Sequence, residues 1–228
     1  MSLSREQVLK ELGIAPVWRL KHPIAPAELP GTDASDERRS RILQMDWALL
    51  KEAVATCTAC ELHKTRTQGV VGVGDEKAEW LIIGEAPGAD EDAQGEPFVG
   101  QAGRLLDAML AAIGLQRGEN VYIANVLKSR PPGNRNPAPE EVAACMPYLE
   151  RQIQLIQPKI IIALGRFAVQ SLLNTEEAIG KLRGRVHQHQ GIPLVVTYHP
   201  AYLLRNLPDK EKAWEDLCLA RETMKKFS

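Results

Sequence analysis

The chain has 228 residues, of which 44% are hydrophobic and 25% charged, and its formal net charge is −1. This composition is typical of a globular protein large enough to bury a core without disulfides or metals, and it excludes a largely disordered chain. No apolar run approaches the roughly 18 residues that span a membrane, and the N-terminus lacks the apolar core of a secretory signal, so we expect a cytoplasmic protein.

The first 40 residues predict a helix followed by a linker. Residues 4–12 show helical spacing of apolar side chains and are followed by Gly13, and a proline-rich stretch comes next. Helical spacing resumes over residues 36–56, and we place the start of the main domain near residue 41. The predicted organisation is an N-terminal extension over residues 1–40 and a larger domain over residues 41–228.

From residue 78 onward, short apolar runs alternate with helical patterns. The runs read as buried strands at residues 78–85, 121–126, 159–165 and 192–200. The helical patterns cover residues 103–115, 139–156, 165–173 and 210–227. This alternation predicts an α/β fold, a three-layer α/β/α sandwich around a four-stranded, mainly parallel sheet.

Ligand sites in such sheets form at the carboxyl ends of the strands. The first predicted strand ends in the turn GEAPG at residues 84–88, whose amides can face a ligand. Asn125 ends the second strand, and its amide could pair with the edge of a nucleobase or cap its own turn. His199 ends the fourth strand, where it could donate to a developing oxyanion or be purely structural.

Two further segments follow these strand ends. An acidic run and a constrained aromatic, Phe98, come after the first strand, and they could equally form a solvated turn with a packed ring. The loop after the fourth strand joins Tyr202 and two leucines to Arg205, which suits a wedge that enters a duplex while the cation meets phosphate. The alternative is a helical turn that buries both leucines. Residues 151–228 carry 12 basic and 7 acidic side chains, so this third of the chain could attract a polyanion.

Three of these segments resemble the signature motifs of family 4 uracil-DNA glycosylases. They read GEAPGADEDAQGEPFVGQAG, ANVLKSRPPGNRNP and TYHPAYLLR, and a fourth segment, CTACELHKTRTQGVVGVGD, is similar to the metal-binding segment of that family. The resemblance covers about residues 50–226, with every segment in the family's order. It implies a DNA repair glycosylase that flips uracil out of DNA and hydrolyses its N-glycosidic bond, leaving an abasic site.

The resemblance also implies roles for particular residues. Phe98 would stack on the flipped base, Asn125 would pair with its polar edge, and His199 would stabilise negative charge on the departing uracil. The backbone around Glu85 and Ala86 would line the pocket. The candidates to position water or balance the cationic sugar are Asp90, Glu91 and Asp92. The residues that would hold the DNA open are Tyr202, Leu203, Leu204 and Arg205.

Family members hold a [4Fe–4S] cluster with four cysteines, and this chain departs from that pattern. Cys57, Cys60 and Cys145 match three of the positions, but the fourth is Ser129, and Cys218 does not fit the spacing. A hydroxyl is a harder and far less acidic ligand than a thiol, so it would hold iron more weakly. The cluster could therefore be absent, labile or ligated through the serine oxygen.

Two other readings stay open. The chain could be a catalytically weak or inactive DNA-binding homologue associated with the replisome, or a glycosylase for another deaminated base. Residues 12–20 resemble the start of the bacterial DNA polymerase III psi subunit, which suggests contact with a replication protein. The alternative is a helix and strap that fold onto the chain's own domain. The loop after Ser129 lacks the Lys-Arg-Arg-Ile-His insertion of relatives that trap DNA covalently, so we expect hydrolytic turnover. We also expect the protein to be a monomer.

Overall fold

The computed structural model describes residues 5–13 and 34–227, in two units that comprise residues 1–38 and 39–228. In the first unit, α1 spans Arg5–Glu11. Most of the predicted partner segment lies outside the described residues, which stop at residue 13 and resume at residue 34. Within the described residues, no helix is both long and apolar enough to cross a membrane.

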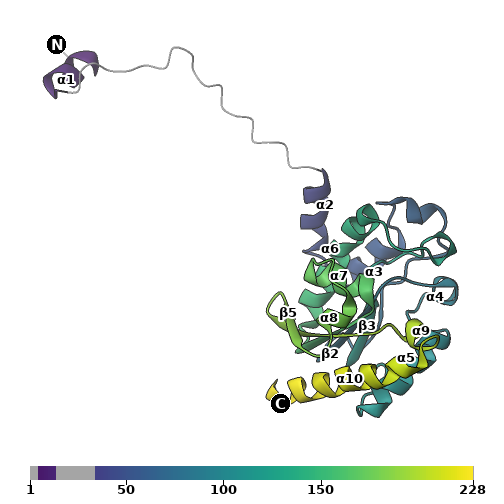
Figure 1. Ribbon diagram of the computed structural model, residues 1–228. Coiled ribbons are helices and arrows are strands. Elements are labelled where there is room, and N and C mark those ends of the chain that lie inside the picture. The colour runs from purple at the N-terminus through teal and green to yellow at the C-terminus, as the bar shows by residue number, and fades with distance from the viewer. Residues whose placement is uncertain (1–4, 14–33, 228) are drawn as a thin grey trace. The chain divides into compact units, whose positions relative to one another are not determined.

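The second unit is built on a six-stranded sheet with the strand order β1-β3-β2-β4-β6-β5 (Figure 1). Its centre consists of four parallel strands, which are β3 (Val121–Asn125), β2 (Trp80–Gly84), β4 (Ile160–Leu164) and β6 (Ile192–Thr197). All residues of β2, β3 and β4 are buried, which explains why these strands read as continuous apolar runs. The α/β prediction and its four parallel strands are confirmed.

The predicted count of four strands is too low, because two short antiparallel strands border the parallel set. β1 (Val73–Gly74) pairs with β3, and β5 (Val186–His189) pairs with β6. β1 has only two residues and shows no periodicity. β5 is half exposed and joins β6 through Gln190 and Gly191, both with positive φ, as a tight hairpin turn requires.

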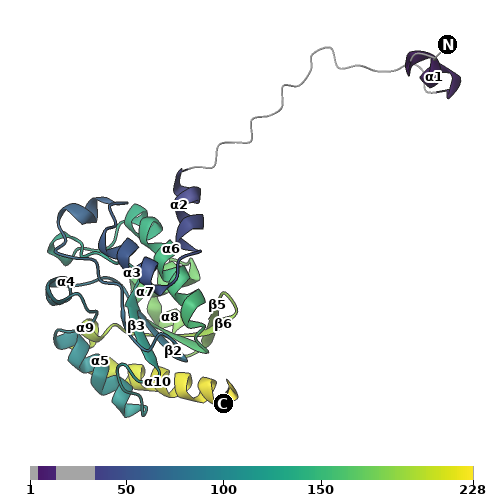
Figure 2. The same cartoon turned by 180° about the vertical axis from the view of Figure 1, so that it is seen from behind.

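Helices cover both faces of the sheet (Figure 2). One face packs on α6 (Pro139–Ile156), α7 (Arg166–Leu173) and α8 (Ile179–Leu182), through residues such as Leu149, Ile153 and Val169. The other face packs on α5 (Gln101–Ala112) and α10 (Lys210–Met224), through Leu106, Leu110 and Leu217. These two apolar clusters lie between the sheet and its two helical layers, which together make the three layers of the predicted sandwich.

The remaining helices are short, and several were not predicted. Residues 36–56 form two helices, α2 (Ala34–Ile42) and α3 (Trp47–Ala55), because Asp46 caps the second one by accepting from the Leu49 amide at 2.9 Å. The acidic run forms α4 (Ala89–Gln94), and the segment after β6 begins α9 (Pro200–Leu203). Both follow strands directly, so they contribute to the edge of the sheet where the parallel strands end.

Candidate active site

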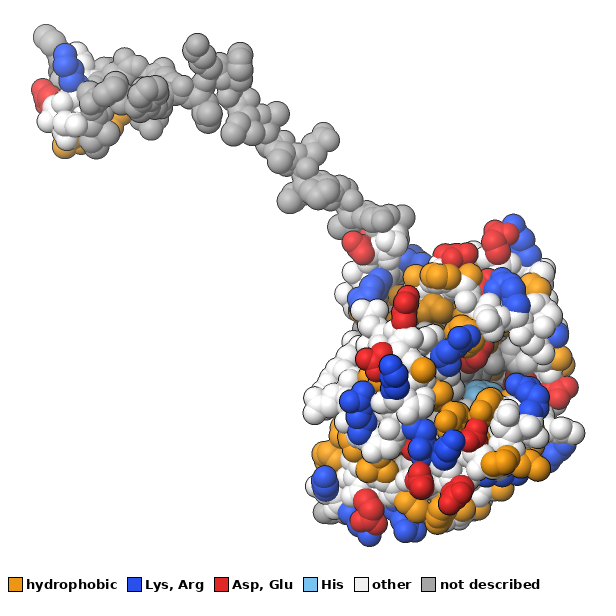
Figure 3. Space-filling model, viewed as in Figure 1, with side chains coloured by type: hydrophobic (Ala, Val, Ile, Leu, Met, Phe, Trp, Pro, Cys, Tyr) orange, Lys and Arg blue, Asp and Glu red, His pale blue; other side chains and the backbone are white. Residues whose placement is uncertain are grey.

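A cleft of about 820 Å³ opens at the carboxyl ends of the four parallel strands. Figure 3 shows a hollow on this face in which a histidine side chain is visible, with Lys and Arg side chains around it. The volume falls in the range of small-ligand sites and exceeds what a single base occupies. The walls of the cleft include Glu85, Phe98, Asn125, Tyr198, His199 and Arg205.

Asn125 lies at the end of β3, with 2% of its surface exposed. Its Oδ1 is buried and has no hydrogen-bond partner among the described residues. An unsatisfied buried acceptor costs about 1–3 kcal/mol, and a ligand N–H could remove that cost. The neighbouring Gly84 leaves room for this arrangement, because a Cβ there would lie 2.4 Å from Asn125 Oδ1 and 2.5 Å from Phe98 Cζ.

Phe98 occupies a left-handed backbone conformation, with φ at 57°. Two contacts hold it there: Arg117 donates to the Phe98 carbonyl at 2.9 Å, and the bare Cα of Gly103 allows the helix to approach that carbonyl. The ring of Phe98 lies 5.4 Å from the His199 ring at an interplanar angle of 30°. The two rings therefore form a nearly parallel pair inside the cleft.

His199 caps α9 and is neutral at physiological pH. Its Nδ1 accepts from the Ala201 amide at 3.1 Å, so the single proton of the neutral ring is on Nε2. Burial lowers the pKa of His199 to about 4, and the charge of Arg205 lowers it further, while Glu91 opposes the shift. Gly165, with φ at 85°, lets β4 approach, since a Cβ there would lie 2.8 Å from His199 Cβ. The ring can therefore offer a fixed N–H donor to a ligand.

The acidic run contributes only partly to the cleft. Asp92 is buried away from it, and both of its carboxylate oxygens accept from the Thr67 amide at 2.9 Å. Asp90 is exposed outside the cleft. Glu91 lines the cleft, but its carboxylate accepts from the Gly88 and Val99 amides, each at 3.0 Å. Glu91 therefore ties together the residues on either side of α4, and Asp92 ties α4 to the segment at Thr67.

The side chain of Glu85 is the carboxyl group that the sequence reading overlooked. It lines the cleft at the end of β2, and burial raises its pKa to about 7, with the nearby charge of Arg166 opposing the shift. A carboxyl with a pKa near 7 can exchange a proton at physiological pH. The rule that sites form at strand ends could have identified it, because Glu85 directly follows the strand.

The segment after His199 places its four predicted DNA-contacting residues differently. Tyr202 and Arg205 line the cleft, and Leu204 is 38% exposed beside them. Leu203 is buried in the hydrophobic core, where it has no access to a surface. A helical turn explains the difference, since neighbouring positions of α9 point in different directions.

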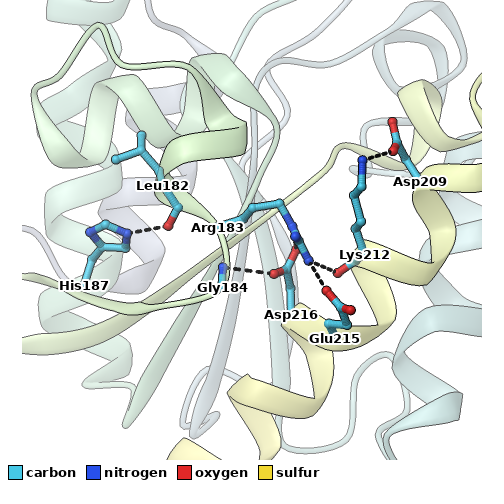
Figure 4. Close-up of polar contacts among 8 residues, drawn as sticks. All are labelled: Leu182, Arg183, Gly184, His187, Asp209, Lys212, Glu215 and Asp216. Atoms are coloured by element: carbon cyan, nitrogen blue, oxygen red, sulfur yellow. Dashed lines mark hydrogen bonds and ion pairs between the residues drawn. The ribbon is translucent and has the colours of Figure 1, made fainter.

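Behind this segment, two aromatic rings and an ion-pair cluster support the cleft wall. Tyr198 stacks on Tyr202 at 5.1 Å and 21°, and the Tyr202 hydroxyl donates to Asp209 at 2.6 Å. Arg183 lies 6.0 Å from the Tyr198 ring and donates to Asp216 of α10 at 3.1 Å. Figure 4 shows the Arg183 side chain reaching α10, where Lys212 and Asp209 form a second ion pair. The Tyr202 ring is thus held in place by its neighbours.

The predicted cluster ligands come together only in part. Cys60 and the buried Cys145 share a hydrogen bond between their thiols, which lowers the pKa of Cys60 to about 6 and raises that of Cys145. The Lys128 amide lies 3.5 Å from Cys145 Sγ. Across residues 5–13 and 34–227, no three His, Cys or acidic side chains are arranged to hold a metal ion.

Arg66 occupies the position beside Ser129. Its guanidinium donates to Ser129 Oγ at 2.7 Å and to the carbonyls of Ala55 and Cys57, both at 2.9 Å. The hydroxyl oxygen therefore already accepts a hydrogen bond from a guanidinium. These residues do not fit a cluster held by four thiolates.

The fold and the cleft agree with the comparison to known protein families. Residues 71–218 match the model of the uracil DNA glycosylase superfamily. This match covers more than half of the chain, and the chain belongs to that superfamily.

Individual relatives show which group of the superfamily this chain resembles. A type-4 uracil-DNA glycosylase of Archaeoglobus fulgidus is 51% identical over 159 residues, which cover 66% of this chain and 79% of the relative. The type-4 enzymes of Pyrobaculum aerophilum and Thermotoga maritima are each 43% identical, over 77% and 78% of this chain and 93% and 94% of the relatives. A type-5 enzyme of Thermus thermophilus is 36% identical over 46% of this chain and 53% of its own length. The similarity is thus to the type-4 group.

Proposed function

We propose that this protein is a DNA repair enzyme that removes uracil from DNA by hydrolysing its N-glycosidic bond, leaving an abasic site. The observation that carries the proposal is the buried, unpartnered Oδ1 of Asn125 at the floor of the cleft. Uracil offers a ring N–H donor next to a carbonyl acceptor, which the two ends of an amide side chain can pair with simultaneously. The type-4 relatives support the same activity.

The base reaches the cleft by leaving the DNA stack. Extruding a nucleotide costs a few kcal/mol, and contacts inside the pocket must offset that cost. In the proposal Phe98 stacks on the flipped uracil, the Glu85–Ala86 backbone lines the pocket, and Asn125 reads the polar edge. The Nε2–H of His199 then donates to the oxygen on which negative charge appears as uracil departs.

Water must attack the sugar carbon once the base begins to leave. Among the acidic candidates, Glu91 and Asp92 already accept backbone hydrogen bonds, and Asp90 is exposed outside the cleft. We assign the positioning of water to the Glu85 carboxylate, because it lines the cleft and has a pKa of about 7. Glu91 then holds the loop after Phe98 through the Val99 amide, and Asp92 holds the segment at Thr67.

Contacts with DNA form around the mouth of the cleft in this proposal. Arg205 and Arg166 lie on its walls and carry charges that suit phosphate. The exposed Leu204 side chain is the candidate to fill the gap left by the flipped nucleotide, and Tyr202, on the cleft wall, is a further candidate DNA contact. Leu203 supports the loop from within the core.

The decisive experiment is a gel assay for abasic sites on single-stranded and double-stranded oligonucleotides that contain one uracil. Strand cleavage after alkali, dependent on both enzyme and uracil, is the expected result. Binding without cleavage on every substrate would favour the alternative of an inactive replisome-associated module. Substrates with hypoxanthine or xanthine in place of uracil test the activity on other deaminated bases.

Replacing Asn125 with Ala is expected to lower the excision rate by about 5- to 150-fold. The physical reason is the 1–3 kcal/mol cost of leaving the polar edge of the buried base unpaired. Single-turnover kinetics on a uracil oligonucleotide measure the effect. Gln154→Ala is the matched control, because it also removes an amide, and Gln154 is exposed on α6 and lies outside the cleft. Equal rates for wild type and Asn125→Ala would remove Asn125 as the base reader.

Ser129 makes the metal content of this chain testable. We infer that Ser129 stands at a cluster-ligand position and that its hydroxyl, bound by Arg66, weakens iron binding there. Ser129→Cys is expected to retain more iron than the wild type after aerobic purification, as measured by iron analysis and by the absorbance near 400 nm. Cys218→Ser serves as the control, because Cys218 lies on α10. A brown, air-stable wild type with four irons per chain would contradict the inference.

Three expectations from the sequence stay predictions. They are the cytoplasmic location, the monomeric state and the contact of the N-terminal segment with a replication protein. Pull-down of a replication protein by the full chain, lost on deletion of residues 1–38, would support the last of these.

A further inference from the structure

A buried lysine lies directly beneath the base-reading end of β3. Lys128 is 1% exposed, and its Nζ donates to the Asn125 carbonyl at 2.7 Å and to Gln152 Oε1 at 2.6 Å, with a longer contact of 3.3 Å to the Val71 carbonyl. In the described part of the chain, no carboxylate forms a salt bridge with it. Burying an amine is costly unless its N–H groups find acceptors, so a role that offsets the remaining cost is expected.

From this geometry we infer that Lys128 is a positioning residue for uracil recognition, which fixes the position of Asn125 relative to the cleft. The inference rests on the proposed function. Asn125 is the last residue of β3, and beyond it the chain leaves the sheet. The Lys128 amine donates to the backbone carbonyl of Asn125, the same residue whose side chain lines the cleft.

The lysine itself is held from two directions. Gln152 of α6 donates through Nε2 to the Val71 carbonyl at 2.8 Å, which turns its Oε1 toward Lys128 Nζ. The Lys128 carbonyl accepts from the Val70 amide at 2.8 Å. The segment after β3 is therefore fixed to α6 and to the chain before β1, so the Asn125 peptide plane has little freedom to rotate.

Without the lysine, the Asn125 carbonyl loses its buried donor, and the peptide is left to the bond that the Val126 amide donates to the Gly84 carbonyl at 3.0 Å. The amide would then shift relative to the stacked rings of Phe98 and His199. Small misplacements of a group that contacts the reacting substrate can lower rates by about 100-fold. We expect the loss of excision rate on removing the lysine to require an intact Asn125, because Lys128 does not itself line the cleft.

A double-mutant cycle in the full-length protein tests this dependence. Lys128→Met keeps the length of the side chain and removes its charge and donors. We expect it to slow single-turnover excision at least tenfold in the wild-type background and less than threefold in the Asn125→Ala background, at a temperature where all four proteins are folded. Equal fold losses in both backgrounds, or no loss in the wild-type background, would overturn the inference.

Two further variants keep the test decisive. If Lys128→Met does not fold, Gln152→Met carries the same cycle, because it removes the acceptor that orients the ammonium; the same two outcomes apply to it. Tyr148→Phe is the matched control, since it removes a buried hydroxyl bond to the Ala53 carbonyl from the same helix, α6. It is expected to lower Tm without coupling to Asn125. Absence of excision by the wild type would count against the proposed function, whereas additive losses would count only against the lysine.

Discussion

Replacing Glu85 with Gln is expected to lower the single-turnover rate of uracil excision by about 10²–10⁴-fold at pH 8. That range is typical of removing a positioned general base. The carboxyl is protonated below its pKa of about 7 and ionised above it, so only the wild-type rate should rise as pH increases through 7. The rate of Glu85→Gln should be nearly flat with pH, and the two proteins should converge toward pH 5.

The pH profile separates this role from a structural one. Glu96→Gln is the matched control, because Glu96 is exposed in the same region and lies outside the cleft. It should keep both the rate and the inflection near pH 7. An inflection that survives in Glu85→Gln would assign the titration to another group. His199 would not explain it, because its pKa of about 4 keeps the ring neutral over this range.

Replacing His199 with Asn is expected to slow excision by about 10²–10³-fold with little change in DNA affinity. An Asn side chain can still cap α9, because its Oδ1 can accept from the Ala201 amide as Nδ1 does now. What it lacks is the Nε2–H donor, which in the proposed function acts on charge that appears only as uracil departs. A loss of this kind lowers the rate of the chemical step and leaves ground-state binding unchanged.

The readouts are single-turnover kinetics and the Kd for DNA, measured with the same oligonucleotide. His199→Gln should recover part of the rate, because a longer amide can bring an N–H toward the position of Nε2. Equal losses for Asn and Gln, together with a fall in Tm for both, would indicate that the ring matters for folding alone.

The sequence predicted the parts of the fold whose signals are local and strong. Fully buried strands such as β2 and β4 read as apolar runs, and α6 begins at its proline, Pro139, where the pattern placed it. The edge strands gave no comparable signal. β1 has two residues, and the burial of β5 alternates, so neither stands out from a loop.

The sequence predicted those cleft residues that stand at the ends of strands, because ligand sites in parallel sheets form there. That rule selected Asn125 and His199, and both line the cleft. It could not distinguish Leu203 from Leu204, because the direction of a side chain depends on a helical turn that four residues do not reveal. Lys128 was equally hidden: a lysine in a proline-rich polar loop normally predicts exposure, whereas tertiary packing buries this one.

The backbone of Phe98 has a consequence for how this protein can evolve. A left-handed conformation costs a non-glycine residue on the order of 1–3 kcal/mol, so Gly at position 98 would relieve strain in the folded chain. The same change would delete the ring that stacks against His199. It would also empty a site in the hydrophobic core, where Phe98 is 6% exposed, at a cost of about 3–5 kcal/mol that exceeds the strain relieved, so stability and ring stacking both favour Phe at this position.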